Sequence, residues 1–296
     1  MADDAMRQVQ QTAQGPMLIV ALEQYEDRDH RIVDDPLAAR MLPAAQRILV
    51  RALRPAPLRH LLINTTERIM PGSWGGFLAR KRYADDAVTA ATGAGIGQLV
   101  VLGAGLDTRA ARLPDPNQVA SYEVDLPRNS AAKRSRLEAA LGRLPAGLHL
   151  VPIDFEADDL IETLTGAGFD PAAPAMFVWE GVTQYLTQPA VRATLTALAS
   201  AAPGSRLIFT YILRSLIQGT DLHGADSLYR RFVAKNPIWH FGLEPADVTP
   251  LLAEFGWTAA EDIGPEDYAE RYFAPAGRRL QAMEIERFVA AERVGQ

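Results

Sequence analysis

Gln98-Leu-Val-Val-Leu-Gly-Ala-Gly-Leu-Asp-Thr-Arg109 is the stretch that decides the fold, because an apolar run of strand length ends in two glycines and then turns helical. The pattern predicts a buried parallel strand, a tight loop and the start of a helix. Gly103 and Gly105 suit a positive φ and a close approach of the backbone to a ligand. Asp107 or Thr108 is expected to cap the helix that follows.

A second strand-like run, residues 118–125 (Q-V-A-S-Y-E-V-D), ends in a carboxylate. Asp125 lies close to the ~20-residue offset at which an acid that binds ribose is expected after a glycine loop. A carboxylate at that position can accept hydrogen bonds from both ribose hydroxyls. The loop and the acid together indicate a nucleoside-type cofactor, either NAD or S-adenosylmethionine (SAM).

The loop lacks the third glycine of the dinucleotide pattern G-x-G-x-x-G, and Thr108 stands in its place. In dinucleotide sites that glycine lets the pyrophosphate lie against the helix N-terminus. A side chain there favours a cofactor without phosphates, which SAM is. An NAD(P)-dependent oxidoreductase remains the alternative, because small residues also occur at this position in dehydrogenases.

The bulk composition is that of an ordinary globular protein. The chain has 296 residues, of which 48% are hydrophobic and 22% charged, so that one large α/β domain with additions or two small domains can form. The net charge of −6 gives no support for a nucleic-acid partner. No apolar run approaches the ~18 residues of a membrane span, and no membrane partner is expected.

The cysteine and histidine content limits the catalytic and metal-binding chemistry that the chain can support. The sequence has no cysteine, which removes disulfides and thiolate catalysis, and its five scattered histidines predict no metal site. The N-terminus is acidic and lacks the basic-then-apolar pattern of a signal peptide, so a cytoplasmic chain is expected.

Residues 1–97 are predicted to form a helical N-terminal region. An aspartate-proline start at residues 34–36 and helical spacing over residues 48–63 support this prediction. Residues 72–76 (G-S-W-G-G) are interpreted as a flexible break, followed by a helix over residues 77–88 with a basic first half. One cation of that half is a candidate partner for a carboxylate of the cofactor.

Strand-like and helix-like segments alternate from residue 98 to residue 213, which implies βαβ units and a parallel sheet with helices on both faces. Ligands bind such sheets at the carboxyl ends of the strands. Gly103, Asp125, Asp154 and Glu180 all lie at predicted carboxyl ends. Each acid alone could be a helix cap or a solvent-exposed charge, but the convergence of four strand ends indicates a site.

Residues 214–242 lose this rhythm and combine aromatic with cationic side chains. A segment of this length is either a packed structural cover or a lid over the substrate. A strand is expected over residues 257–263, and residues 285–291 are predicted as a final strand or helix.

Three stretches then carry a resemblance to the leucine carboxyl methyltransferase family, which includes protein phosphatase methyltransferases and many bacterial SAM-dependent O-methyltransferases of small molecules. The stretches are residues 101–109 (V-L-G-A-G-L-D-T-R), residues 122–127 (Y-E-V-D-L-P) with Lys133, and residues 179–186 (W-E-G-V-T-Q-Y-L). Shorter stretches that resemble its flanking motifs are residues 34–36, 240–243 and 255–257.

The resemblance implies a class I methyltransferase fold of the α/β class, with a doubly wound, mostly parallel seven-stranded Rossmann-like sheet. Residues 1–97 would be the helical cap and substrate region. Residues 98–296 would be the SAM-binding core, with residues 214–242 as a lid insertion.

The resemblance also implies the cofactor site, whose residues follow the first four strands or lie on one helix of the cap. They are Arg80, Gly103, Ala104, Gly105, Asp125, Leu126, Asp154, Phe155, Glu180 and Gly181. Asp125 would hold the ribose, while Asp154 and Phe155 would flank the adenine. Arg80 would pair with the carboxylate of the methionine moiety, and Glu180 would lie near its amino group.

The expected reaction is methyl transfer from SAM to a carboxylate or hydroxyl of a small-molecule acceptor, which leaves S-adenosylhomocysteine. A carboxylate needs no general base, whereas a phenol or amine would benefit from one, for which Tyr185, His223 and His240 are candidates. The sequence is also compatible with methylation of nitrogen or carbon in an aromatic metabolite, and with a non-catalytic SAM-binding protein. It leaves a homodimer open as well.

Overall fold

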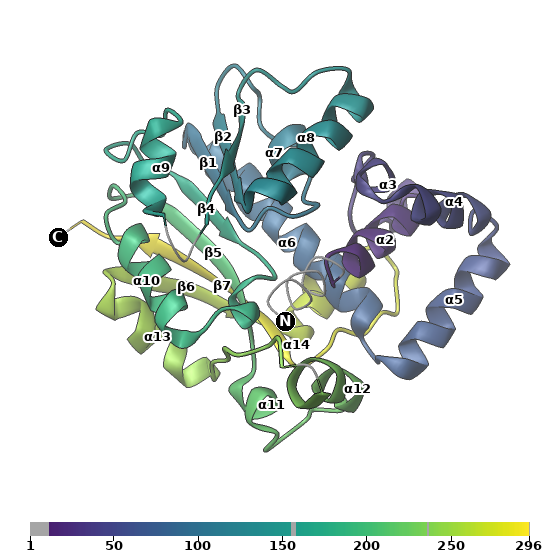
Figure 1. The fold of residues 1–296 in the computed structure, drawn as a ribbon. Helices are drawn as coiled ribbons and strands as arrows, with labels where there is room; N and C mark the ends of the chain where they lie inside the picture. Colours follow the sequence, from purple (N-terminus) through teal and green to yellow (C-terminus); the bar gives the residue numbers. More distant parts are fainter. Residues whose placement is uncertain (1–11, 155–157, 236, 296) are drawn as a thin grey trace.

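A seven-stranded sheet runs through the centre of the computed structural model, which describes residues 12–154, 158–235 and 237–295 (Figure 1). The strands lie in the order β3-β2-β1-β4-β5-β7-β6. Their bounds are β1 (Gln98–Leu102), β2 (Ala120–Asp125), β3 (Leu148–Pro152), β4 (Met176–Trp179), β5 (Arg206–Ile212), β6 (Trp257–Ile263) and β7 (Glu286–Arg293). The sheet confirms the expected fold class.

The neighbouring strands from β3 to β5 pair in parallel, and β7 runs antiparallel between β5 and β6. The final segment, which the sequence left open between strand and helix, is therefore a strand. The order reverses between β1 and β4, and this switch point opens a crevice at the carboxyl ends of the two strands.

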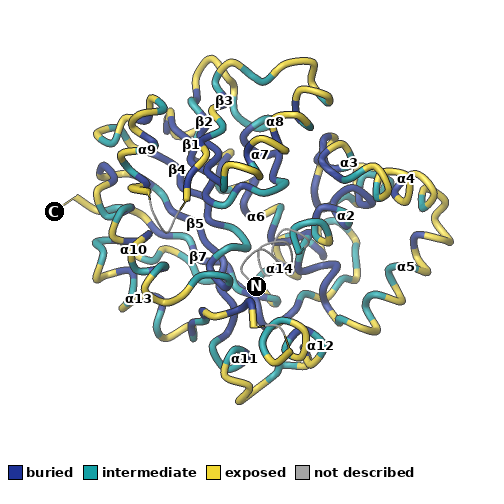
Figure 2. Tube along the Cα trace, in the orientation of Figure 1, coloured by how far each residue is buried: buried dark blue, intermediate teal, exposed yellow. Residues whose placement is uncertain are grey.

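Alternating side chains of the strands enter two separate cores. Leu99 and Val101 of β1 pack into one buried cluster with the helices of the N-terminal region. Val100 and Leu102 pack into another with helices that follow β3, β4 and β5. Figure 2 shows the central strands as buried segments between more exposed helices. Because both faces are covered, β1 and β4 are buried along their whole length and mostly apolar, as parallel strands usually are.

The N-terminal region contains α2 (Gln14–Glu23), η1 (Arg28–His30), α3 (Ala38–Met41), α4 (Ala44–Ala52), α5 (Ala56–Ile69) and α6 (Ser73–Gly93). The helices that follow the first four strands are α7 (Arg109–Arg112), α8 (Pro127–Leu141), α9 (Leu160–Gly166), η2 (Thr183–Tyr185) and α10 (Gln188–Leu198). The remaining ones are α11 (Arg214–Gln218), α12 (Asp226–Tyr229), η3 (Arg230–Lys235), α13 (Pro245–Glu254), α14 (Pro265–Tyr268) and η4 (Ala269–Phe273). None of the helices in the described ranges is both long and apolar enough to cross a membrane.

The helical spacing over residues 48–63 is confirmed, but it belongs to two helices, because α4 ends at Ala52 and α5 begins behind Pro55, whose ring cannot continue a helix. The expectation of a flexible break at residues 72–76 was wrong. Gly72, with φ +76°, is the N-cap of α6, and the four residues after it are buried in the first turn.

Gly75 lies in that turn for a steric reason. A Cβ built on Gly75 would lie closer than van der Waals contact to the carbonyl oxygen of Gln281, so glycine lets the segment before β7 cross the helix. The glycines that suggested a flexible break in the sequence instead allow α6 to pack closely against the segment before β7.

Residues 214–235 and 237–242 fold around a third buried cluster that includes Leu216, Leu228 and Trp239. Phe232 stacks on Trp239 with ring centroids 4.9 Å apart. Part of the aromatic content of this insertion is therefore core packing.

Replacing Gly75 with alanine should destabilise the protein by about 2 kcal/mol, because the added methyl must displace a backbone carbonyl. The matched control is Gly93→Ala at the other end of α6, where nothing lies within 4 Å of the new Cβ. That change should stabilise the protein by up to about 1 kcal/mol through helix propensity. Urea unfolding measures both, and equal midpoints for the two variants would contradict the packing argument.

Candidate functional site

A cavity of about 920 Å³ opens at the carboxyl ends of β1, β2 and β4, a volume in the range of small-molecule sites. The expected cofactor residues that the structure describes all line it: Arg80, Gly103, Ala104, Gly105, Asp125, Leu126, Asp154, Glu180 and Gly181. Phe155 lies outside the described residues. The sheet topology thus brings together side chains that are far apart in the sequence.

The glycine loop after β1 is tightly folded. Gly103 has φ +65° and Gly105 has φ +43°. A Cβ on Gly103 would lie 2.6 Å from a methyl carbon of Val182, so the loop after β4 leaves no room for a side chain. The N–H groups of Gly103 and Ala104 both donate to the carbonyl of Val124, which fixes the loop on the end of β2.

Asp125 holds the loop from the other side. Its carboxylate accepts hydrogen bonds from the N–H of Gly105 at 2.6 Å, the N–H of Leu126 at 2.7 Å and the side-chain amide of Asn129 at 2.6 Å. These donors fix the orientation of the carboxylate at the cavity wall. The acid at the expected ribose position therefore also determines the shape of the loop.

Glu180, after β4, is surrounded by three cations. Its carboxylate lies 2.9 Å from Arg80 Nε, 3.1 Å from Lys81 Nζ and 2.9 Å from Arg109 Nη2. Burial alone would favour the neutral acid, but the positive charges of Lys81, Arg109 and Arg80 outweigh it and hold the pKa of Glu180 below its ordinary value. Glu180 is thus an anion at neutral pH in a buried position.

Arg80 has a second acidic partner that the sequence did not indicate. Its Nη1 donates to both oxygens of Glu286, at 2.8 and 2.9 Å. Glu286 begins β7 and lines the cavity. Burial raises its pKa, although Arg80 opposes the shift. No motif surrounds Glu286, and only its place at a strand end could have marked it.

Arg109 is fully buried and connects Glu180 to two further carboxylates. Its Nε lies 3.0 Å from Asp85 of α6, and its Nη1 lies 2.6 Å from Asp107. Asp107 also accepts from the backbone N–H of Arg109 at 2.7 Å, whereas Thr108 is the N-cap residue of the four-residue α7 and makes no capping hydrogen bond with its side chain. Burial raises the pKa of Asp107, but Arg109 and Lys81 hold it well below its ordinary range.

The same network attaches the N-terminal region to the loop after β1. Thr108 donates its hydroxyl to Asp35 at 2.6 Å. Arg112 lies 2.5 Å from Asp85 and 3.7 Å from Asp35. The threonine that stands in place of the third glycine therefore fixes residues that precede the sheet by more than sixty positions.

The three candidate bases lie in different surroundings. Tyr185 and His240 line the cavity, whereas His223 does not. His223 lies within 3.0 Å of the Ser215 hydroxyl in the insertion and has φ +47°, so its position does not support a catalytic role. Tyr185 donates its hydroxyl to Thr12 at 2.7 Å. Burial raises its pKa, which keeps the phenol protonated at neutral pH.

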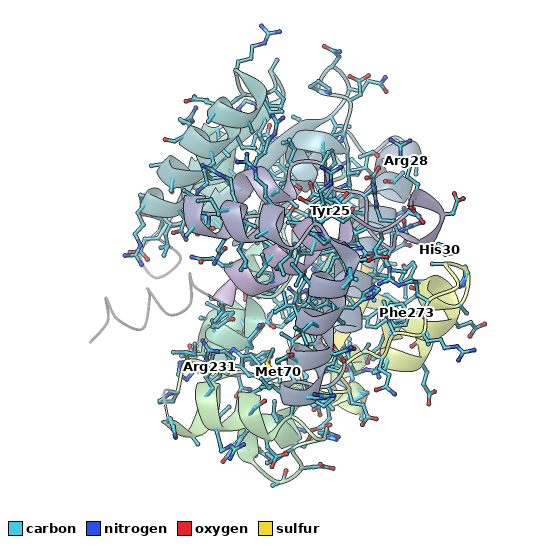
Figure 3. All side chains as sticks on the ribbon, turned by 90° about the vertical axis from the view of Figure 1, so that its right-hand side faces the viewer. Tyr25, Arg28, His30, Met70, Arg231 and Phe273 are labelled. Atoms are coloured by element: carbon cyan, nitrogen blue, oxygen red, sulfur yellow. The ribbon has the colours of Figure 1, made fainter. Side chains whose placement is uncertain are left out.

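The end of the cavity away from the glycine loop is mostly apolar. Its lining side chains come from the N-terminal region, the end of β5, the insertion and the segment before β7, namely Met70, Phe77, Ile212, Leu228, Phe232, Ile238, Trp239, Met283 and Ile285. Arg231 adds a cation. Figure 3 shows Met70, just after α5, on the same side of the molecule as Arg231. In the described ranges no group of three or more side chains could hold a metal ion.

Beneath the glycine loop lies a buried ion pair of β2 and α8. Lys133 Nζ is 2.6 Å from Glu123 and donates to the carbonyl of Ala104 at 3.2 Å. Burial raises the pKa of Glu123 to about 7, although the Lys133 ammonium opposes the shift. The ion pair that supports the glycine loop therefore contains a group, the carboxyl of Glu123, that titrates near neutral pH.

Comparison with known proteins points to one family. Residues 13–199 match the model of the leucine carboxyl methyltransferase family. A Saccharopolyspora erythraea protein named as an S-adenosyl-L-methionine-dependent methyltransferase is 32% identical over 269 residues, which cover 89% of this chain and 88% of the relative. A Mycobacterium tuberculosis protein of the same name is 32% identical over 262 residues, covering 83% of this chain and 73% of the relative.

Solved structures agree in fold. A Thermobifida fusca protein described as a methyltransferase has a TM-score of 0.57 at 16% identity and covers 80% of this chain and 89% of its own. A Streptomyces avermitilis protein of the DUF574 family has a TM-score of 0.56 at 17% identity, with 78% and 88% covered. At these identities the likeness concerns the fold alone.

Replacing Glu123 with glutamine should change how stability depends on pH. In the wild type the folded state holds a proton on Glu123 more tightly than the unfolded state, so folding stability falls as pH rises from about 4.5 to about 7. The variant cannot titrate there and should gain about 3 kcal/mol relative to the wild type over that window. Urea unfolding at several pH values measures the difference. The exposed change Glu138→Gln is the control, and a difference between Glu123→Gln and wild type that is constant with pH would refute the assignment.

Proposed function

Because the chain belongs to the leucine carboxyl methyltransferase family and is a SAM-dependent methyltransferase, we propose that it methylates an oxygen atom of a small-molecule acceptor. With this family assignment, two alternatives with which the sequence was also compatible are set aside: an NAD(P)-dependent oxidoreductase and a non-catalytic SAM-binding protein. The observation that carries the proposal is the division of one cavity into a charged end beside the glycine loop and an apolar end beyond it.

The charged end is the proposed cofactor position. The backbone of Gly103 to Gly105 would face the cofactor, Asp125 would accept hydrogen bonds from the ribose, and Asp154 would lie at the adenine. Arg80 and Glu180 would hold the methionine moiety. Because its carboxylate and ammonium share one carbon atom, two side chains that lie 2.9 Å apart can reach both groups.

The apolar end is the proposed acceptor position. A carboxylate acceptor would need only positioning and exclusion of water, because its oxygen is already ionised. The protonated state of Tyr185 supports this choice, since a buried phenol is a poor general base.

Arg231 would pair with an anionic group of the acceptor, and the insertion of residues 214–242 would act as a lid over it. His240 remains the candidate base for a hydroxyl acceptor.

Replacing Asp125 with alanine should lower the affinity for S-adenosylhomocysteine at least about tenfold, because two hydrogen bonds to a charged acceptor are lost. Isothermal titration calorimetry measures the change, with Glu270→Ala as an exposed control outside the cavity. A 2′,3′-dideoxy analogue separates ribose binding from loop shape. It should bind the wild type and the variant equally weakly, and a further large loss in the variant would assign the effect to the loop.

Methyl transfer to an acceptor panel tests the reaction. With methyl-labelled SAM, aromatic carboxylic acids should accept label that alkali releases as methanol, because esters hydrolyse and ethers do not. Label on phenols that survives alkali would still fit oxygen methylation. Transfer to amines alone would contradict the proposal and favour a nitrogen methyltransferase.

A further inference from the structure

The hairpin of α4 and α5 exposes apolar side chains to an unusual degree. Seven large hydrophobic side chains are exposed over the described residues, and five belong to this hairpin. They are Ile48, Leu49, Leu58, Leu61 and Ile69, and Ile48 and Leu61 expose 65% and 64% of their surface. In Figure 1 the hairpin stands at the edge of the molecule away from the sheet, and Figure 2 shows it as mainly exposed.

The inner side of α5 is fastened by an arginine. Arg59 is the one buried residue in this helix. It donates to Glu26 at 3.0 Å and to the carbonyl of Arg54 at 2.9 Å, and its guanidinium lies 5.9 Å from the ring centroid of Tyr25. Polar contacts thus replace much of the apolar packing that normally attaches an amphipathic helix.

The outer side of α5 is an exposed apolar stripe. With 3.6 residues per turn, residues 58, 61, 65 and 69 fall within an arc of about 80°. Three of these are the exposed Leu58, Leu61 and Ile69. Leu62 and Ile63 are half-buried and lie next to the stripe, on the side of Arg59. The exposed stripe therefore extends the apolar surface of the helix beyond the part that packs on the protein.

The charge of the hairpin differs from that of the chain. Residues 44–69 contain five arginines and one glutamate, whereas the whole chain carries −6. The glutamate, Glu67, is half-buried and accepts from the N–H groups of Gly72 and Trp74 at 2.7 and 2.8 Å. The exposed arginines are Arg47, Arg51, Arg54 and Arg68.

We propose that the α4–α5 hairpin docks on a membrane surface that contains anionic lipids. Leucine and isoleucine beside exposed arginines, with no exposed carboxylate in residues 44–69, are the composition of a helix that lies in the lipid interface. A second copy of the chain is disfavoured, because a twofold contact would bring like-charged arginines together. Whole-chain charge and the lack of a membrane span had pointed away from membranes, but surface docking depends on local charge.

Vesicle co-sedimentation tests the proposal. The wild type should bind vesicles of equimolar phosphatidylcholine and phosphatidylglycerol at least about tenfold more tightly than vesicles of phosphatidylcholine alone, and less tightly at high salt. Arg51→Gln with Arg54→Gln should weaken binding by roughly fivefold per charge. Leu58→Gln with Leu61→Gln should also abolish most of it. The matched controls on and just after α8, Leu141→Gln and Arg143→Gln, should bind as the wild type does.

The possible outcomes distinguish a membrane surface from a second copy of the chain as the partner of the hairpin. Equal binding of the leucine pair and its controls, or no binding to anionic vesicles, would overturn the proposal. A dimer in analytical ultracentrifugation that the leucine pair dissociates, without vesicle binding, would assign the stripe to a second copy. Calorimetry with S-adenosylhomocysteine on the same variants should give wild-type affinity, so that failure here and failure of the proposed cofactor site are distinguishable.

Discussion

The ionised carboxylate of Glu180, buried among three cations, is the constraint on which the rest of the structure depends. A charge in that position is tolerated only if its partners remain in place, since removing one partner of a buried ion pair costs about 3 to 5 kcal/mol. Those partners come from α6 and from the first residue of α7, while Glu180 follows β4. One carboxylate therefore fixes the relative positions of two helices and a strand end.

The network also explains why the cavity has two kinds of wall. Near the glycine loop the polar groups are held by one another, so they are oriented before any ligand arrives, which is the condition for strong electrostatic interaction in a dry site. The opposite wall is formed mainly by the N-terminal helices, the insertion and the segment before β7. It presents mostly apolar side chains to the cavity and few polar groups. This arrangement separates the proposed cofactor end of the cavity from the proposed acceptor end.

Local patterns predicted the sheet because apolar runs and turn glycines act over short stretches. Spacing alone indicated that Gly103 and Asp125 lie at one edge of the sheet, since Gly103 follows β1 and Asp125 ends β2, and both line the cavity. The helix break before Pro55 and the packing of Gly75 were missed, because the first depends on one ring and the second on Gln281, over two hundred residues away. Glu286 was missed for the same reason, because its place in the site depends on its ion pair with Arg80, which is distant in the sequence. His223 was a candidate by residue type and lies away from the cavity.

The ion pairs between α6 and the loop after β1 bear on how such proteins can be recombined. A chimera that took residues 1–97 from one relative and the sheet from another would separate Asp85 from Arg109 and Asp35 from Thr108. Each half would then present buried charges to an unmatched surface. A graft of the N-terminal helices must therefore keep matching residues in the loop after β1 and at the start of α7.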